Sequence, residues 1–85
     1  MARYKIEIKK SAVKELESIP SNDLKRILSK IESLAENPRP IGSLKLSGDD
    51  RYRIRQGNYR IPYIIKDDIL TIYIVKVGHR KDIYY

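Results

Sequence analysis

Two stretches in the middle of the chain alternate between apolar and basic residues and are separated by Gly57-Asn58. The first reads Arg-Tyr-Arg-Ile-Arg-Gln over residues 51–56, and the second reads Tyr-Arg-Ile-Pro-Tyr over residues 59–63. Because successive side chains of a strand point to opposite faces, each stretch predicts a strand with one apolar, aromatic face and one basic face. Gly-Asn tolerates positive φ, so the two strands are expected to close as a tight hairpin.

The N-terminal part of the chain predicts a strand followed by a short helix. Residues 4–8 alternate between apolar and charged side chains, which is the period of a half-buried strand. A short helix is expected over residues 11–19, with Val13 and Leu16 buried and Ala12 as a further candidate for burial, and Pro20 ends it.

A second helix is the most strongly patterned element of the sequence. Apolar residues from Leu24 to Ala35 recur at i, i+3, i+4 and i+7, the spacing of one buried helical stripe. Ser21-Asn22-Asp23 offers capping oxygens and a first-turn carboxylate at its start, and Asn37-Pro38 stops it.

The C-terminal half predicts a meander of strands over residues 51–56, 59–66 and 69–77, with a second turn at Asp67-Asp68. Pro62 lacks an N–H, so we expect a bulge there or a position where that donor would not pair.

Together these elements predict an α+β fold in a single domain over residues 1–85. The order is β-α-α followed by an antiparallel β-meander, with two helices packed on one face of a four-stranded sheet. A short strand through Leu44 and Leu46 would make the sheet five-stranded, and the first strand is expected beside the last. The arginines would then emerge on the open face, where guanidinium groups bind phosphate in a bidentate fork.

Composition narrows the classes of partner and cofactor. The chain has 18 Lys and Arg against 11 Asp and Glu, a formal charge of +7, which favours a polyanion or an acidic protein as partner. It has no cysteine and one histidine, so we expect no disulfide, no metal site and no small-molecule cofactor. We expect neither a signal peptide nor a membrane span, and therefore a soluble cytoplasmic protein.

The C-terminal residues carry a second set of candidate groups. Val77-Gly78 is followed by an imidazole at His79, a fixed cation at Arg80 and a phenol at Tyr84. These groups can move protons and stabilise charge at a phosphodiester. The alternative interpretation is a solvated basic tail in which Tyr84 simply packs.

Several motifs together resemble the RelE-type toxins of the RelE/ParE toxin–antitoxin superfamily. They are Leu-Lys-Leu-Ser-Gly at 44–48, Tyr-Arg-Ile-Arg at 52–55, Gly-Asn-Tyr-Arg-Ile-Pro-Tyr at 57–63 and Val-Gly-His-Arg-Lys-Asp-Ile-Tyr at 77–84. The ending is similar to that of the ribosome-dependent mRNA nucleases and unlike the His-Gly-Ala-Arg ending of ParE gyrase poisons.

The resemblance implies a metal-free endoribonuclease that enters the ribosomal A site and cuts mRNA there. The 2′-hydroxyl before the cut would attack the adjacent phosphate, giving a 2′,3′-cyclic phosphate and a free 5′-hydroxyl. A cognate RelB-like antitoxin would hold the toxin inactive, and the ribosome and mRNA would be its other partners.

The resemblance also implies residue roles. Arg60 would stabilise the charge of the phosphorane-like transition state. Arg53 and Arg55 fall where family members have basic residues that bind the phosphate. Arg80 falls at the position assigned to leaving-group stabilisation, and Tyr84 would stack on the nucleotide.

Where some family members have lysines proposed to activate the nucleophile, this chain has Arg53 and Arg55. Arginine does not readily accept a proton, because its pKa lies above about 12. We therefore hypothesise that His79 takes or gives the proton, against the alternative that it only hydrogen-bonds the C-terminal segment. Lys45 and Arg51 are further candidates for RNA binding.

Two other functions fit the same residues. One is a ParE-like protein that binds DNA gyrase. The other is a non-catalytic basic module that binds RNA, DNA or an acidic protein, with the cations holding phosphates in salt-sensitive fashion.

Overall fold

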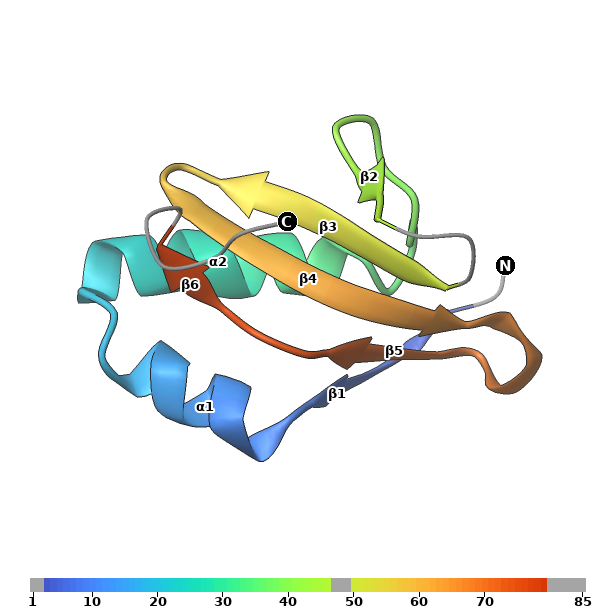
Figure 1. Cartoon of the computed structure of the whole chain (residues 1–85), viewed down its shortest axis with the longest axis horizontal. Helices are drawn as coiled ribbons and strands as arrows, with labels where there is room; N and C mark the ends of the chain where they lie inside the picture. Colours follow the sequence, from blue (N-terminus) through green and yellow to red (C-terminus); the bar gives the residue numbers. More distant parts are fainter. Residues whose placement is uncertain (1–2, 47–49, 80–85) are drawn as a thin grey trace.

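A mixed sheet with two helices on one of its faces forms the structure (Figure 1). The computed structural model describes residues 3–46 and 50–79. In chain order the elements are β1 (Lys5–Ile8), α1 (Lys10–Glu17), α2 (Ser21–Ser33), β2 (Leu44–Lys45), β3 (Arg51–Gln56), β4 (Tyr59–Lys66), the 3₁₀ turn η1 (Asp67–Ile69), β5 (Thr71–Ile74) and β6 (Gly78–His79). The predicted α+β class and element order are confirmed.

The strand order is β1-β5-β4-β3-β2, with β6 pairing β4 beyond the end of β5. β1 and β5 are parallel, whereas the other neighbours are antiparallel. The first strand thus lies beside the last long strand, as expected, and β2 adds the short strand that the segment around Leu44 predicted. The short strand β6 was not predicted, and with it the described sheet has six strands.

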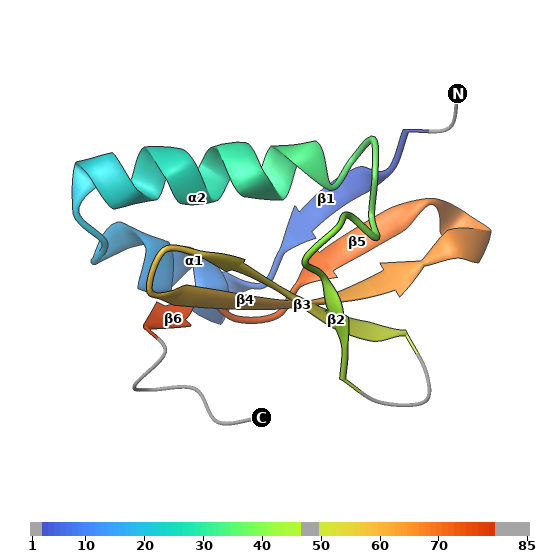
Figure 2. The same cartoon turned by 90° about the horizontal axis from the view of Figure 1, so that it is seen from above.

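Both helices lie on the same side of the sheet, as Figure 2 shows. Between the helices and the sheet lies a core of residues from every layer: Ala12, Leu16, Ile27, Ile31, Leu34, Ile54, Ile61, Tyr63, Ile65, Ile72, Ile74 and Val77. The prediction that Val13 is buried was wrong, because its side chain is 41% exposed. Leu16 and Ala12 are buried as predicted, and they stand one helical turn apart on the inward face of α1.

The second hairpin is less regular than the sequence suggested. Residues 67–69 form the 3₁₀ turn, and Leu70 follows with a positive φ of 48°. Ile69, which was expected in the strand, belongs to this turn and is 58% exposed. The strand starts only at Thr71.

Pro62 produces the expected irregularity in the segment after β5. The Pro62 carbonyl accepts the N–H of Val75 at 3.0 Å, but proline has no N–H to return. Beyond this point the ladder resumes with Gly78 opposite Arg60. Ile61 alone therefore opposes two residues, Lys76 and Val77, which is a β-bulge.

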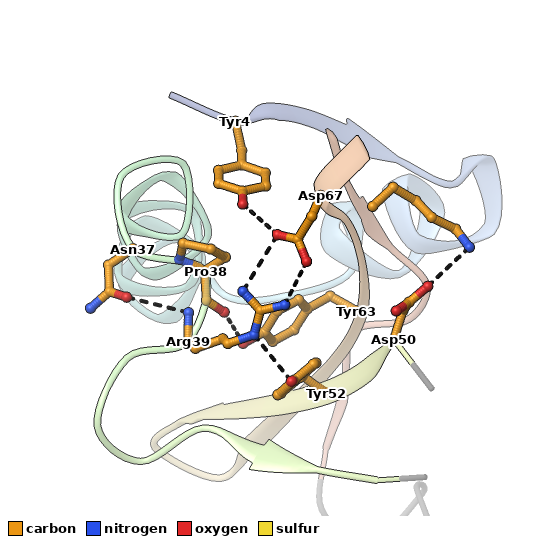
Figure 3. A network of polar contacts seen from close by, with 9 residues as sticks. Tyr4, Asn37, Pro38, Arg39, Asp50, Tyr52, Tyr63 and Asp67 are labelled. Atoms are coloured by element: carbon orange, nitrogen blue, oxygen red, sulfur yellow. Dashed lines mark hydrogen bonds and ion pairs between the residues drawn. The ribbon is translucent and has the colours of Figure 1, made fainter. Parts of the chain in front are cut away.

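A polar cluster ties the loop after α2 to the far end of the sheet (Figure 3). Arg39 donates to Asp67 at 2.8 Å and to the Tyr52 hydroxyl at 3.1 Å. The Tyr4 hydroxyl donates to the other oxygen of Asp67, so this one carboxylate of η1 joins the residue before β1 to the loop after α2. The Arg39 guanidinium also lies 5.3 Å from the centre of the Tyr52 ring.

Beneath this cluster, the hydroxyl of Tyr63 donates to the Pro38 carbonyl at 2.7 Å. Tyr63 is 1% exposed, and burial raises its pKa to about 12. The hydroxyl therefore keeps its proton at neutral pH and remains a donor. This bond fixes the end of α2 over the sheet.

Over residues 3–46 and 50–79, neither helix is long and apolar enough to cross a membrane.

We predict that Tyr63→Phe lowers the free energy of unfolding by about 1–2 kcal/mol, because the Pro38 carbonyl loses its buried donor. Denaturant unfolding followed by circular dichroism measures the change. Tyr73→Phe is the matched control, since Tyr73 is 40% exposed. Equal effects of the two substitutions would contradict the role assigned to the Tyr63 hydroxyl.

Asp67 makes stability depend on pH. Hydrogen bonds from Arg39 and then Tyr4 lower the pKa of Asp67 below its ordinary value. A lowered pKa means that the unfolded state takes up the proton first, so this stabilisation is present above the unfolded-state pKa. It is lost as pH falls below about 4 and through the folded-state pKa.

As the pH is lowered from about 6 to 3, the Tm of Asp67→Asn should therefore fall less than the Tm of the wild type. Asp68→Asn, one residue away, should retain the wild-type pH dependence. The same loss of Tm in all three proteins would show that Asp67 does not contribute.

Candidate functional site

The β3–β4 hairpin brings three arginines together on the face of the sheet that carries no helix, here called the helix-free face. Arg55 lies directly opposite Arg60, and Arg53 lies opposite Pro62, diagonal to Arg60. Diagonal side chains on antiparallel strands lie only about 7–8 Å apart, and directly opposed Cβ atoms about 4.5–5.5 Å apart. Ile54 and Ile61, which alternate with these arginines, are buried beneath the helices. We call Arg53, Arg55 and Arg60 the arginine cluster.

Arg53 is partly buried and has no anionic partner among the described residues. Its Nε is buried and has no hydrogen-bond partner among the described residues. Burial lowers its pKa, and the positive charges of Arg55 and Arg60 lower it further. Arginine still stays protonated at neutral pH, so the cluster concentrates positive charge.

Arg53 and Arg55 have no acidic partner among the described residues. The ion pairs within residues 3–46 and 50–79 are formed by other basic residues: Arg3, Lys5, Arg39, Lys66 and Lys76. A phosphate on this face would supply acceptors for Arg53 Nε and reduce the repulsion within the cluster.

The helix-free face also holds an apolar pocket that the sequence analysis missed. The pocket has a volume of about 160 Å³ and is lined in part by Arg51, Leu46, Pro62, Ile64 and Val75. The sequence did contain a signal for this pocket, the apolar run at 61–65. Such a run places apolar side chains on both faces of its strand, and a strand of this kind is usually covered on both faces. A nucleobase or an apolar side chain could occupy such a pocket.

The two candidate RNA-binding residues fall on different faces. Arg51 lies opposite Ile64 and shares the helix-free face with the cluster. Lys45 lies opposite Tyr52, which shares a face of the sheet with the buried Ile54 and Tyr63. The Lys45 side chain therefore points to the helix-covered face. The structure thus brings Arg51, and not Lys45, to the side of the arginine cluster.

His79 is not brought to the arginine cluster. It lies opposite Tyr59 in the β4–β6 pair, and the two rings meet edge-on with their centres 5.7 Å apart. Tyr59 packs against the core under α1, so His79 lies on the helix-covered face. This arrangement does not support the predicted proton transfer by His79. Arg80 and Tyr84 lie outside the described residues.

The chemistry available is therefore electrostatic. Adjacent guanidinium groups can bind a phosphate and stabilise additional negative charge that develops on it. Within the described part of the chain, no three His, Cys, Asp or Glu side chains are grouped so that they could hold a metal ion.

Known proteins resemble this chain over nearly its whole length. A family model described as the ParE toxin of the type II toxin–antitoxin system parDE matches residues 6–84. The chain belongs to the RelE/ParE toxin family. The resemblance proposed from the sequence motifs is thereby confirmed, and the protein is a RelE-type toxin of a type II toxin–antitoxin system.

Relatives of this RelE-type toxin span nearly its whole length. The protein named RelE1 of Methanocaldococcus jannaschii is 34% identical, with 96% of both chains covered. Toxin RelE3 of the same organism is 38% identical, with 94% of both chains covered. In the crystal structure of the archaeal RelE–RelB complex from Pyrococcus horikoshii, a chain of 32% identity matches with a TM-score of 0.81, covering 98% of this chain and 100% of that one.

We predict that the arginine cluster of this RelE-type toxin binds inorganic phosphate. In NMR spectra of the guanidinium Nε–Hε groups, phosphate should shift the Arg53 and Arg55 signals saturably, because neither of these two side chains forms an ion pair among the described residues. Arg26, an exposed residue of α2, is the control. Equal, unsaturable shifts at all three arginines would indicate only a general ionic effect.

Proposed function

We propose that this RelE-type toxin is a ribosome-dependent endoribonuclease that cleaves mRNA in the A site without a metal ion. The observation that carries the proposal is the arginine cluster, in which Arg55 faces Arg60 and Arg53 has a buried Nε with no described partner. Three cations converging on one surface suit a phosphodiester whose negative charge increases during reaction.

In the proposed reaction, the 2′-oxygen forms a bond to phosphorus as the bond from phosphorus to the 5′-oxygen breaks. The 2′-hydroxyl loses a proton and the departing 5′-oxygen gains one, so the step consumes no further reactant. Arg53 and Arg55 bind the phosphate, and Arg60 stabilises the charge of the phosphorane-like transition state. Arg80 and Tyr84 complete the proposal as leaving-group stabiliser and stacking partner.

The shape of the site supports dependence on the ribosome. The arginine cluster stands on a sheet surface, and Arg55 is exposed. Such a surface can bind phosphate but cannot by itself align a 2′-hydroxyl with the phosphorus, which needs the strand held in a defined conformation. In this proposal the ribosomal A site supplies that alignment.

The proposed inhibitor is a RelB-like antitoxin. Structures of relatives from Pyrococcus horikoshii and Methanococcus jannaschii are described as RelE–RelB complexes, which supports such a partner for this chain. A charge of +7 favours an acidic segment of the antitoxin, and binding would also stabilise this small domain by mass action.

Arg60→Ala should slow cleavage by a factor on the order of 10²–10³, because a charge that acts in the transition state is lost. The measurement is primer extension on mRNA bound to programmed ribosomes, combined with analysis of the product ends for a cyclic phosphate. Arg26→Ala removes the same charge from the exposed surface of α2 and should cleave at the wild-type rate.

Activity of Arg60→Ala within a few-fold of wild type would remove this residue from the proposed role. Intact mRNA with folded wild-type protein would refute the nuclease function itself.

The placement of His79 on the helix-covered face gives a separate prediction. His79→Gln should leave the shape of the pH–rate profile between about pH 5.5 and 8 unchanged, because the imidazole does not reach the arginine cluster. A profile that loses a step near the histidine pKa in this variant would restore the proton-transfer hypothesis.

Inhibition of DNA gyrase is the second candidate, because the matching family model is described as a ParE toxin. Gyrase-dependent DNA cleavage with intact mRNA would favour it over the nuclease.

A further inference from the structure

The β-bulge after β5 determines which face the last described residues occupy. Up to the bulge, Tyr73 pairs with Ile64 and Val75 bonds to Pro62, so both belong to the helix-free face. In an uninterrupted strand, residues 77 and 79 would follow them on that face.

The extra residue of the bulge reverses this alternation. Val77 turns into the core and is 2% exposed, and His79 lies opposite Tyr59 on the helix-covered face. Gly78 takes the place opposite Arg60. A shift of one residue in a strand moves every following side chain to the opposite face.

Glu15 of α1 holds both bulged residues. Its Oε1 accepts the backbone N–H of Val77 at 3.0 Å, and its Oε2 accepts the Lys76 ammonium group at 2.8 Å. The side chain is 29% exposed, so these bonds are partly shielded from water. Residues 15 and 77 are far apart in the sequence, and the contact forms only when α1 packs against the sheet.

α1 is well suited to present this carboxylate. Ala12 and Leu16 anchor the helix in the core at 0% and 7% exposure. Glu15 therefore sits on a fixed support rather than on a mobile loop. The N–H of Val77 adjoins a buried side chain, where an unpaired backbone donor would be strongly unfavourable.

We propose that Glu15 is a positioning residue that locks the bulge at Lys76 and Val77 and thereby sets the face on which the C-terminal end of the sheet presents its side chains. Bulges beside functional sites commonly redirect a side chain in this way. The consequence for catalysis rests on the proposed nuclease function, in which Arg80, the next residue after His79, and Tyr84 further along take part.

The test of positioning is independent of activity. In Glu15→Ala, hydrogen exchange at the Val77 amide should accelerate at least about tenfold, and the NOE between the Tyr59 and His79 rings should weaken. Glu15→Gln keeps an acceptor oxygen and should restore both signals. Lys76→Met removes the ion pair with Glu15 but keeps the Glu15 carboxylate, so it should leave the Val77 amide protected. Should Glu15→Ala fail to fold, Glu15→Asp withdraws the carboxylate by one methylene and should give a smaller change in the same direction.

An unchanged Val77 amide and an unchanged ring NOE in the folded Ala or Asp variant would overturn the proposal. So would the same loss of both signals in Glu15→Gln as in Glu15→Ala.

The second arm measures cleavage on programmed ribosomes. The maximal rate of Glu15→Ala should fall by a factor on the order of 10–100, with little change in the concentration needed for half-maximal rate, and Glu15→Gln should recover most of it. An unimpaired rate in a variant whose bulge is lost would overturn the catalytic consequence. If the wild-type protein does not cleave mRNA, the proposed nuclease function is refuted. The Val77 amide exchange and the NOE between the Tyr59 and His79 rings would still decide whether Glu15 positions the bulge.

Discussion

The pairing of Arg55 with Arg60 across the β3–β4 hairpin is the constraint on which the rest of the site depends. It places like charges next to each other, which is unfavourable without a counter-charge. The register is nevertheless fixed, because a slip of one residue would bury the arginines and expose Ile54 and Ile61. Gly57, with a φ of 59°, allows the tight turn that sets this register. The hydrophobic burial of one face thus offsets the repulsion between like charges on the other.

The stabilising contacts lie away from the arginine cluster. At the far end of the sheet, Arg39 and Asp67 join the loop after α2 to η1, and Tyr63 adds a buried hydrogen bond to Pro38. At the other end, the Glu15 carboxylate lies on the helix-covered face, where it accepts hydrogen bonds from Lys76 and Val77 of the bulge. Arg53 and Arg55 therefore take no part in these stabilising contacts and remain available to bind an anion on the helix-free face.

Local patterns predicted most of the fold. The alternation on both sides of Gly57-Asn58 gave the hairpin and the common face of its arginines, and the stripe from Leu24 to Ala35 gave α2. The face of His79 could not be predicted in this way, because it depends on a bulge that Pro62 favours and that Glu15 holds from a distant helix. Counting residues along a regular strand would have put His79 beside the arginines, on the wrong face.

The most direct test of the central claim is a structure of the protein on a ribosome whose A-site codon carries 2′-O-methyl groups, which block the attacking oxygen. A phosphate of this codon should lie within about 2.7–3.2 Å of guanidinium nitrogens of Arg53, Arg55 or Arg60, on the helix-free face. A codon bound against the helix-covered face near His79, or an arginine cluster without any contact to mRNA, would contradict it.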